Sequence, residues 1–259
     1  MPQRKTSAAA DRQPAKTNRL KRQLRVATNN PATRRRSSTA NKRLTEKFAW
    51  IVEKWRRQFN HKRRSPMPHR LPPMLASTVE QPFNDADWQF EIKWDGYRTL
   101  AYLSSGKVDL RSRNQLSLCA KFTEVAEALA KWPVNAVVDG EVVVLSENGR
   151  ADFGALQNWR QTQSGTLVYY VFDLLWLDGI DLQKEPLTVR QEVLKSLIPE
   201  GGVIRFSESI DEAGIDFYEA AAQNGLEGIM AKRKSAPYRS GTRTKDWYKI
   251  KLETRHEAL

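Results

Sequence analysis

Hydrophobic and polar residues alternate along several short stretches of this chain, and a period of two is typical of β-strands. Residues 88–93 switch between large apolar side chains and polar ones. This pattern predicts a half-buried strand whose polar face carries Lys93. Asp95-Gly96 follows at once, and this pair of residues predicts a tight turn.

The same patterns predict further elements downstream. Further strands are expected at residues 99–103, 107–111, 136–145, 167–177, 203–206, 228–233 and 247–252. Apolar residues at helical spacing predict helices at residues 122–129, 188–197 and 211–224, with Thr188 and Gln191 as a possible capping box. Hairpins and helices mix without a regular β-α-β alternation, which favours an α+β fold with antiparallel sheets.

The N-terminal quarter of the chain has a different character. Residues 44–59 carry apolar side chains at helical spacing with Lys and Arg between them, which predicts a basic amphipathic helix. We expect this helix to dock on the globular domain by its apolar face, and contact of its basic face with DNA is the alternative. A linker rich in proline and basic residues follows. The predicted domains are an arm at 1–43, a helix with linker at 44–70, and a globular domain at 71–259.

The charge of the chain is concentrated in this N-terminal part. The net charge is +13, yet residues 1–70 hold 21 basic residues against three acidic ones, which leaves residues 71–259 with a net charge of −5. Residues 1–43 have few large apolar side chains, so we expect disorder. Such an arm would bind nucleic acid by counterion release. A solvated tail and an organellar transit peptide are the alternatives.

Composition excludes several classes of protein. No apolar run approaches the roughly 20 residues that cross a bilayer, so no membrane contact is expected. Cys119 is the only cysteine, which excludes an internal disulfide and a zinc site built from several cysteines. We expect a cytoplasmic protein, associated with the nucleoid.

Two carboxylates interrupt the apolar strand predicted at residues 136–145. They belong to Asp139-Gly140-Glu141, and all other residues of the stretch are Val, Ala or Leu. Carboxylates in a buried strand are costly unless they are paired with cations or bound to a metal. This stretch is therefore a candidate for a functional site.

Five short stretches share this theme of cations and carboxylates on strands. They are Lys93-x-Asp95-Gly96-x-Arg98, Ser112-Arg113-Asn114, Asp139-Gly140-Glu141, Glu227-Gly228 and Lys249-x-Lys251. In this order they resemble the motifs of the covalent nucleotidyltransferases, which comprise DNA ligases, RNA ligases and mRNA capping enzymes. Details such as Phe153-x-x-Leu156-Gln157 look most like the ligase domain of bacterial ATP-dependent DNA ligases of the non-homologous end-joining type. The resemblance runs from about Leu71 to Leu252.

The resemblance implies a fold and a reaction. The fold is the α+β, ATP-grasp-like fold of these enzymes, with two antiparallel sheets flanked by helices. Lys93 would attack the α-phosphate of ATP and hold AMP as a lysyl phosphoramidate. Lys249 and Lys251 would neutralise charge on the phosphoryl oxygens. Arg98 and Arg113 would contact ribose, phosphate or the 5′-phosphate of a nick.

The resemblance also assigns the metal and the adenine base. Glu141 and Glu227 would bind Mg²⁺, or Mn²⁺, directly or through water. Phe172 would stack on adenine, with Tyr170 as the alternative, and Glu91 would contact the adenine edge. Asp95 and Asp139 are expected to organise their turns. Taken singly, these residues fit ordinary surface ion pairs and core packing equally well.

The chain departs from the resemblance in two places. The sequence ends soon after Lys251, so we expect no C-terminal OB domain like that of related ligases, and Asn114-Gln115 stands where relatives often have glycine. We expect DNA with a nick or break as substrate, and an end-joining or OB-domain protein as partner. An RNA ligase or capping-type enzyme and a non-catalytic DNA-binding subunit are the alternatives. The cysteine-rich regions of NAD-dependent ligases are absent.

Overall fold

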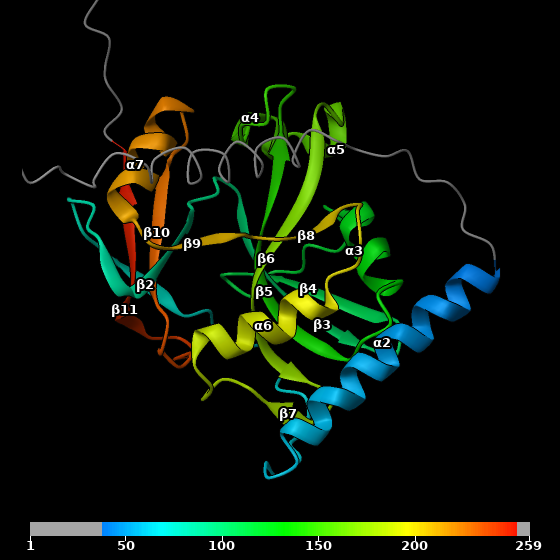
Figure 1. Cartoon of the computed structure of the whole chain (residues 1–259). Helices are drawn as coiled ribbons and strands as arrows, with labels where there is room; N and C mark the ends of the chain where they lie inside the picture. The colour runs from blue at the N-terminus through cyan, green and yellow to red at the C-terminus, as the bar shows by residue number, and fades with distance from the viewer. Residues whose placement is uncertain (1–37, 253–259) are drawn as a thin grey trace, which may run out of the picture.

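The computed structural model describes residues 38–252, which form two β-sheets placed side by side with helices on their outer faces (Figure 1). The first sheet has the order β1 (Leu75–Thr78), β11 (Arg243–Lys251), β10 (Gly228–Arg233), β2 (Asp85–Ile92) and β9 (Ser209–Glu212). The second has the order β4 (Lys107–Ser112), β3 (Tyr97–Ser104), β5 (Ala136–Leu145), β6 (Thr166–Leu177) and β7 (Ile180–Asp181), with β8 (Ile204–Phe206) beside β6.

The helices cover these sheets from outside. They are α2 (Ser38–Gln58), α3 (Thr123–Ala130), α4 (Phe153–Gln157), α5 (Trp159–Thr162), α6 (Leu187–Leu197) and α7 (Gly214–Gln223). Helix α7 packs on the first sheet, α3 and α6 pack on the second, and α2 lies on α6. The predicted α+β fold with antiparallel sheets is confirmed. Two pairs at sheet edges, β1 with β11 and β6 with β8, are parallel.

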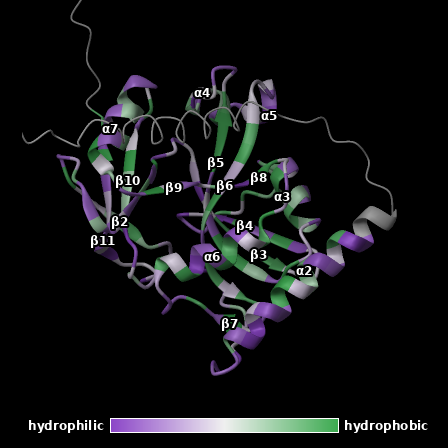
Figure 2. Cartoon of the chain, in the orientation of Figure 1, coloured by the Kyte–Doolittle hydropathy of each residue, from purple (hydrophilic) through white to green (hydrophobic). Residues whose placement is uncertain are grey.

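Most predicted strands form because each buries an apolar face. The bounds of β5 are those predicted, and β3 and β4 pair as the expected antiparallel hairpin. Strands β5 and β6 are buried along almost their whole length, and Figure 2 shows how far hydrophobic residues fill them. These two strands form the centre of the second sheet.

Two local predictions were wrong. The helix predicted from Asp211 begins at Gly214, because residues 209–212 form β9 and pair with β2. The capping box at Thr188 does not form, because Pro186 is the N-cap of α6 and the cap makes no side-chain hydrogen bond. The first error arises because a neighbouring strand holds residues 209–212, and the second because α6 starts at a proline that the interpretation did not take as its cap.

Helix α2 docks on the domain, as expected. Its side chains Phe48, Ile51 and Trp55, with Phe59 just after the helix, are buried in the core beneath the second sheet, and Trp55 Nε1 donates to Ser196 Oγ at 2.9 Å. The helix starts at Ser38, earlier than predicted, so the end of the arm assigned to residues 1–43 is helical. Residues 1–37 of that predicted arm lie outside the described residues. Within the described part, no helix is both long and apolar enough to span a bilayer.

The segment from Lys93 to Gly96 connects the two sheets. Strand β2 belongs to the first sheet and β3 to the second, so Asp95-Gly96 is a crossing between sheets and not the tight turn that was predicted. Gly96 is needed here because a Cβ at this position would lie 2.2 Å from the carbonyl oxygen of Val142. The crossing places Lys93 where the two sheets meet.

Candidate functional site

A cavity of about 220 Å³ lies between the two sheets. Its wall contains seven of the predicted site residues, namely Glu91, Lys93, Arg98, Arg113, Glu141, Phe172 and Lys249. These residues come from β2, β3, β5, β6 and β11 and from the crossing and turn next to them, so both sheets contribute. The cavity is thus where the sequence motifs meet.

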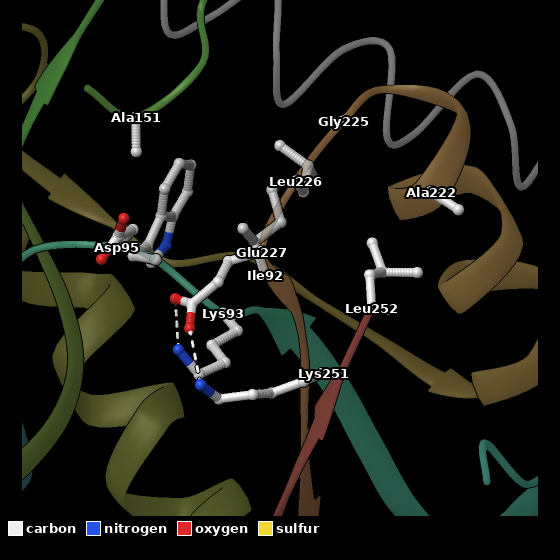
Figure 3. A pocket seen from close by; sticks show the side chains of 11 residues that line it. Ile92, Lys93, Asp95, Ala151, Ala222, Gly225, Leu226, Glu227, Lys251 and Leu252 are labelled. Atoms are coloured by element: carbon white, nitrogen blue, oxygen red, sulfur yellow. Dashed lines mark ion pairs between the residues drawn. The ribbon is translucent and has the colours of Figure 1, made fainter. Parts of the chain in front are cut away.

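The two remaining predicted residues lie around a second, larger cavity. Glu227 and Lys251 line this cavity of about 770 Å³, and Lys93 lines both cavities. The Glu227 carboxylate forms an ion pair with Lys93, and its Oε1 lies 3.6 Å from Lys251 Nζ. Figure 3 shows both lysine nitrogens directed at this carboxylate. Asp95 lines the same cavity, where burial and then Glu227 raise the pKa of its carboxyl.

The backbone around Lys93 depends on a glycine. The Lys93 amide donates to the carbonyl oxygen of Gly228 at 3.1 Å, which joins the end of β2 to the start of β10. Gly228 has φ of +153°, and a Cβ there would lie 2.2 Å from the carbonyl oxygen of Ile250. The Glu227-Gly228 pair therefore brings a carboxylate beside Lys93 at a point where only glycine fits.

The Glu91 side chain is buried, and both of its carboxylate oxygens contact donor groups. Its Oε2 lies 2.7 Å from Lys232 Nζ, and its Oε1 accepts from Gln191 at 2.9 Å and Gln89 at 3.1 Å. Burial lowers the pKa of Lys232, although Glu91 opposes this shift. The predicted polar face of β2 is therefore not exposed to solvent, because Gln89 and Glu91 pack into a buried polar network.

Arg98 is held rigidly by a buried carboxylate. Its Nε and Nη2 donate to the two oxygens of Asp139 at 2.5 and 2.6 Å, and Tyr238 also donates to Asp139 at 2.7 Å. Despite burial, this partner raises the pKa of Arg98. Asp139 was predicted to organise a turn, which is wrong, because it lies inside β5 and is fully buried. Pairing with Arg98 is what makes a carboxylate tolerable there.

Phe172 rather than Tyr170 reaches the cavity. Two cations lie near the Phe172 ring, with Arg98 Cζ 4.6 Å and Lys232 Nζ 4.0 Å from its centroid. Tyr170 stacks on Trp94, with ring centroids 3.9 Å apart, and is not part of the wall of the small cavity. Of the two aromatic candidates, only Phe172 lines the small cavity.

Glu141 differs from Asp139 in forming no ion pair with a described residue, although Arg98 and Lys93 lie near enough to lower its pKa. No side-chain hydrogen bond or ion pair joins its carboxyl to any other residue in the described range 38–252. Burial raises the pKa of Glu141 to about 8, against the lowering effect of Arg98. Glu227 adds to this rise, so the two carboxylates influence each other electrostatically.

The donors present suit a magnesium ion that is completed by its substrate. Within residues 38–252, no three His, Cys, Asp or Glu side chains are grouped so that they could hold a metal by themselves. Mg²⁺ usually takes only one or two carboxylates and completes its shell with water and phosphate oxygens. Glu141, with a carboxyl that pairs with no described cation, and Glu227 fit this requirement.

Arg113 stands on the turn that follows β4. It is exposed and lines the small cavity. Gln115, where relatives often have glycine, has φ of +63°, so this turn does adopt the left-handed conformation that glycine favours. Its Nε2 donates to the carbonyl oxygen of Leu71 at 3.0 Å, which holds the turn in place.

The sequence interpretation missed three residues of the cavity wall. Lys232, Arg243 and Trp247 line it together with the predicted residues. Alternation along β10 could have identified Lys232, because it lies two residues from Met230, another residue of the same wall. Trp247 lies two residues from Lys249 on β11, so alternation could have identified it too, whereas nothing local in the sequence marks Arg243.

Comparison with known proteins adds to this geometry. The family model of the ATP dependent DNA ligase domain matches residues 73–251. The multifunctional non-homologous end joining protein LigD of Pseudomonas aeruginosa is 37% identical over 198 residues, which are 75% of this chain and 23% of that protein. The SPbeta prophage-derived DNA ligase-like protein LigB of Bacillus subtilis is 31% identical over 180 residues, which are 69% of this chain and 66% of that protein.

Solved structures show the same relationship. The ligase domain of LigD from M. tuberculosis is 32% identical with a TM-score of 0.63, and the match covers 70% of this chain and 60% of that one. A mycobacterial DNA ligase D complexed with ATP and MES is 33% identical with a TM-score of 0.62, at the same coverage. The chain thus spans less than two thirds of the length of most of these proteins, and only about a quarter of the Pseudomonas protein.

Proposed function

We propose, from the premise that this chain belongs to the family of ATP-dependent DNA ligases, that it transfers AMP from ATP to Lys93 and from there to DNA. The observation that carries this proposal is the position of Lys93. Its side chain lies at the junction of the two cavities, with cations on one side and the Glu227 carboxylate on the other. A nucleophile that receives a phosphoryl group needs both kinds of neighbour.

In the first step, Lys93 Nζ forms a bond to the α-phosphorus of ATP. The bond from that phosphorus to the bridging oxygen breaks, and pyrophosphate leaves with the electron pair. The ammonium group must lose a proton before it can attack. Glu227 contacts this nitrogen and is the nearest carboxylate available to accept the proton.

Cations around the small cavity would hold the phosphates. Lys249 lines it without an ion pair to any residue in the described range, so its charge is available to a phosphoryl oxygen. Arg98 has two nitrogens committed to Asp139 and one, Nη1, left for ribose or phosphate. Arg113, which is exposed at the rim, and Lys251, beyond Lys93, are placed to meet the 5′-phosphate of DNA or the leaving pyrophosphate.

The adenine base would lie against Phe172. That ring forms part of the wall of the small cavity, and Glu91 lines the same wall. Two carboxylates, Glu141 and Glu227, would hold Mg²⁺ or Mn²⁺. The bound ion would neutralise phosphate charge and so favour attack on phosphorus.

The substrate and partners follow from the relatives. The Pseudomonas relative is named as an end-joining protein and the Bacillus relative as a ligase-like protein. We infer that the substrate is DNA with a nick or break, that an end-joining or OB-domain protein assists, and that the protein works at the nucleoid.

Parallel assays with ATP, GTP and NAD test the proposal. The full chain is incubated with each labelled nucleotide and Mg²⁺, and covalent label on the protein is measured. Label from ATP alone supports the proposal, and absence of label from ATP refutes it. Lys107→Ala, at an exposed site on β4, is the matched control for Lys93→Ala. Sealing of nicked DNA and nicked RNA duplexes then separates a DNA ligase from an RNA ligase.

A further inference from the structure

One face of α2 remains exposed after the helix has docked. Its residues Arg43, Lys47, Trp50, Lys54 and Arg57 are all exposed, and together we call them the α2 stripe. They are spaced by four and three residues in turn, so they lie along one side of the helix. The stripe extends for roughly 21 Å, at 1.5 Å per residue.

The stripe is strongly basic with an aromatic residue at its centre. Trp50 is 67% exposed, which makes it one of the few large apolar side chains of the described domain that face solvent. Lys47 pairs with Glu200 at 3.1 Å and Arg57 with Glu53 at 3.1 Å, all at exposed positions. Exposed pairs of this kind contribute little and exchange easily.

The other two cations of the stripe have no such partner. Neither Arg43 nor Lys54 forms an ion pair with another residue in the part of the chain that the structure describes. The surroundings are also basic, because residues 42–64 contain nine Lys or Arg and two Glu. The local field therefore attracts polyanions.

Docking of α2 does not explain this face. The apolar residues that fix the helix on the domain, such as Phe48 and Trp55, are buried and lie on a different side of the helix, although Lys54 Nζ lies 5.1 Å from the centroid of the Trp55 ring. None of the stripe residues lines either cavity near Lys93. The helix also lies outside residues 73–251, which match the ligase family model. The stripe is thus separate from the candidate active site in both structure and sequence.

We propose that the α2 stripe binds the phosphate backbone of duplex DNA, as a second contact distinct from the site at Lys93. The four cations match a row of phosphates, and Trp50 packs against the sugar and base edges between them. A membrane surface fits less well, because an interfacial helix inserts its apolar face and that face is already buried here. This inference depends on the charge and exposure of α2 and not on the chemistry at Lys93.

Salt dependence of DNA binding tests the inference. The full chain and the double variant Arg43→Glu/Lys54→Glu are titrated with an intact, unnicked duplex at several salt concentrations. Each phosphate contact that is lost lowers the slope of log K against log [salt] by roughly 0.9, so the double variant should lose about 2 units of slope and at least tenfold in affinity at low salt. The control, Lys107→Glu/Lys131→Glu, changes net charge equally at two exposed sites away from α2.

Trp50→Ala provides an independent readout. It should weaken binding at an unchanged salt slope, because it removes an uncharged contact. A stripe variant with the affinity and slope of the control overturns the inference. Covalent labelling by ATP is measured on the same samples and should be unchanged in all of them. Absence of covalent labelling in the wild-type protein would contradict the proposed function. It would not affect the inference about the α2 stripe.

Discussion

The Glu227 carboxylate bridges two lysines, pairing directly with Lys93 and lying 3.6 Å from Lys251 Nζ. An ammonium group paired in this way cannot attack phosphorus until it has lost a proton. The carboxylate must therefore take the proton or release Lys93 when ATP binds. The proposed role as proton acceptor makes Glu227 necessary for the first step.

Glu227→Gln should accordingly slow adenylation. The amide keeps the shape of the side chain but can no longer accept the Lys93 proton, and loss of such a group costs about 10²–10⁴-fold in rate. Single-turnover labelling at saturating ATP measures this rate. Glu219→Gln, at an exposed position on α7, is the control and should keep the wild-type rate. A rate for Glu227→Gln within twofold of wild type would contradict the role given to this carboxylate.

The raised pKa of Glu141 predicts how the free energy of unfolding changes with pH. Its pKa rises from 4.5 to about 8 in the folded protein. Between these values the folded state keeps a proton that the unfolded chain has released, so raising the pH through this window lowers the free energy of unfolding. Glu141→Gln carries no such proton and should lose less stability from about pH 5 to about pH 8.

Urea denaturation of both proteins in the presence of a metal chelator measures this difference. The comparison between the two proteins isolates Glu141, because every other titrating group is shared. An equal loss of stability in both proteins would show that the carboxyl titrates near its usual pKa.

Asp139→Asn should destabilise the fold strongly. The substitution leaves the Arg98 guanidinium without its bidentate partner, and breaking a buried pair from one side costs about 3–5 kcal/mol. Tyr238→Phe removes one hydrogen bond to the same carboxylate and one from the Met74 amide, and should cost about 1–3 kcal/mol. Glu208→Gln breaks the exposed pair with Lys195 and should cost less than about 1 kcal/mol. Thermal and chemical unfolding would give this order, and equal losses in the three variants would disprove it.

Two tryptophans on α2 differ in burial, so their substitutions can be compared. Trp55 is 2% exposed and donates to Ser196, whereas Trp50 is 67% exposed. Trp55→Ala should cost about 3–5 kcal/mol of unfolding free energy, since it opens a cavity and leaves a polar partner unpaired. Trp50→Ala should change stability by no more than about 0.5 kcal/mol. If both variants unfold like the wild-type protein, α2 does not contribute to the core.

Much of this fold could be predicted because its strands bury apolar faces with a clear period of two. Strand β5 has its predicted bounds, and the hairpin of β3 and β4 forms as expected. The motifs that resemble nucleotidyltransferases also come together around two cavities that share Lys93, although nothing in their sequence spacing alone places them there. The roles assigned to the individual residues remain predictions.

What could not be predicted depends on contacts between distant segments. Strand β9 is short and half polar, and it is a strand because β2 lies beside it. Asp95-Gly96 has the composition of a hairpin turn, yet the segment crosses between sheets because β3 pairs with β5 and not with β2. Asp139 and Glu141 are both carboxylates of the same short stretch of sequence. Only the packing of Arg98 decides that Asp139 is paired and that Glu141 is not.

The central claim is that Lys93 carries the AMP. The most direct test is to incubate the full chain with ATP and Mg²⁺, digest the protein, and locate the added AMP by mass spectrometry, with Lys93→Ala in parallel. We predict one AMP per chain, attached at Lys93 through an acid-labile phosphoramidate bond, and none in the variant. AMP at another residue, or equal adenylation of Lys93→Ala, would contradict the account.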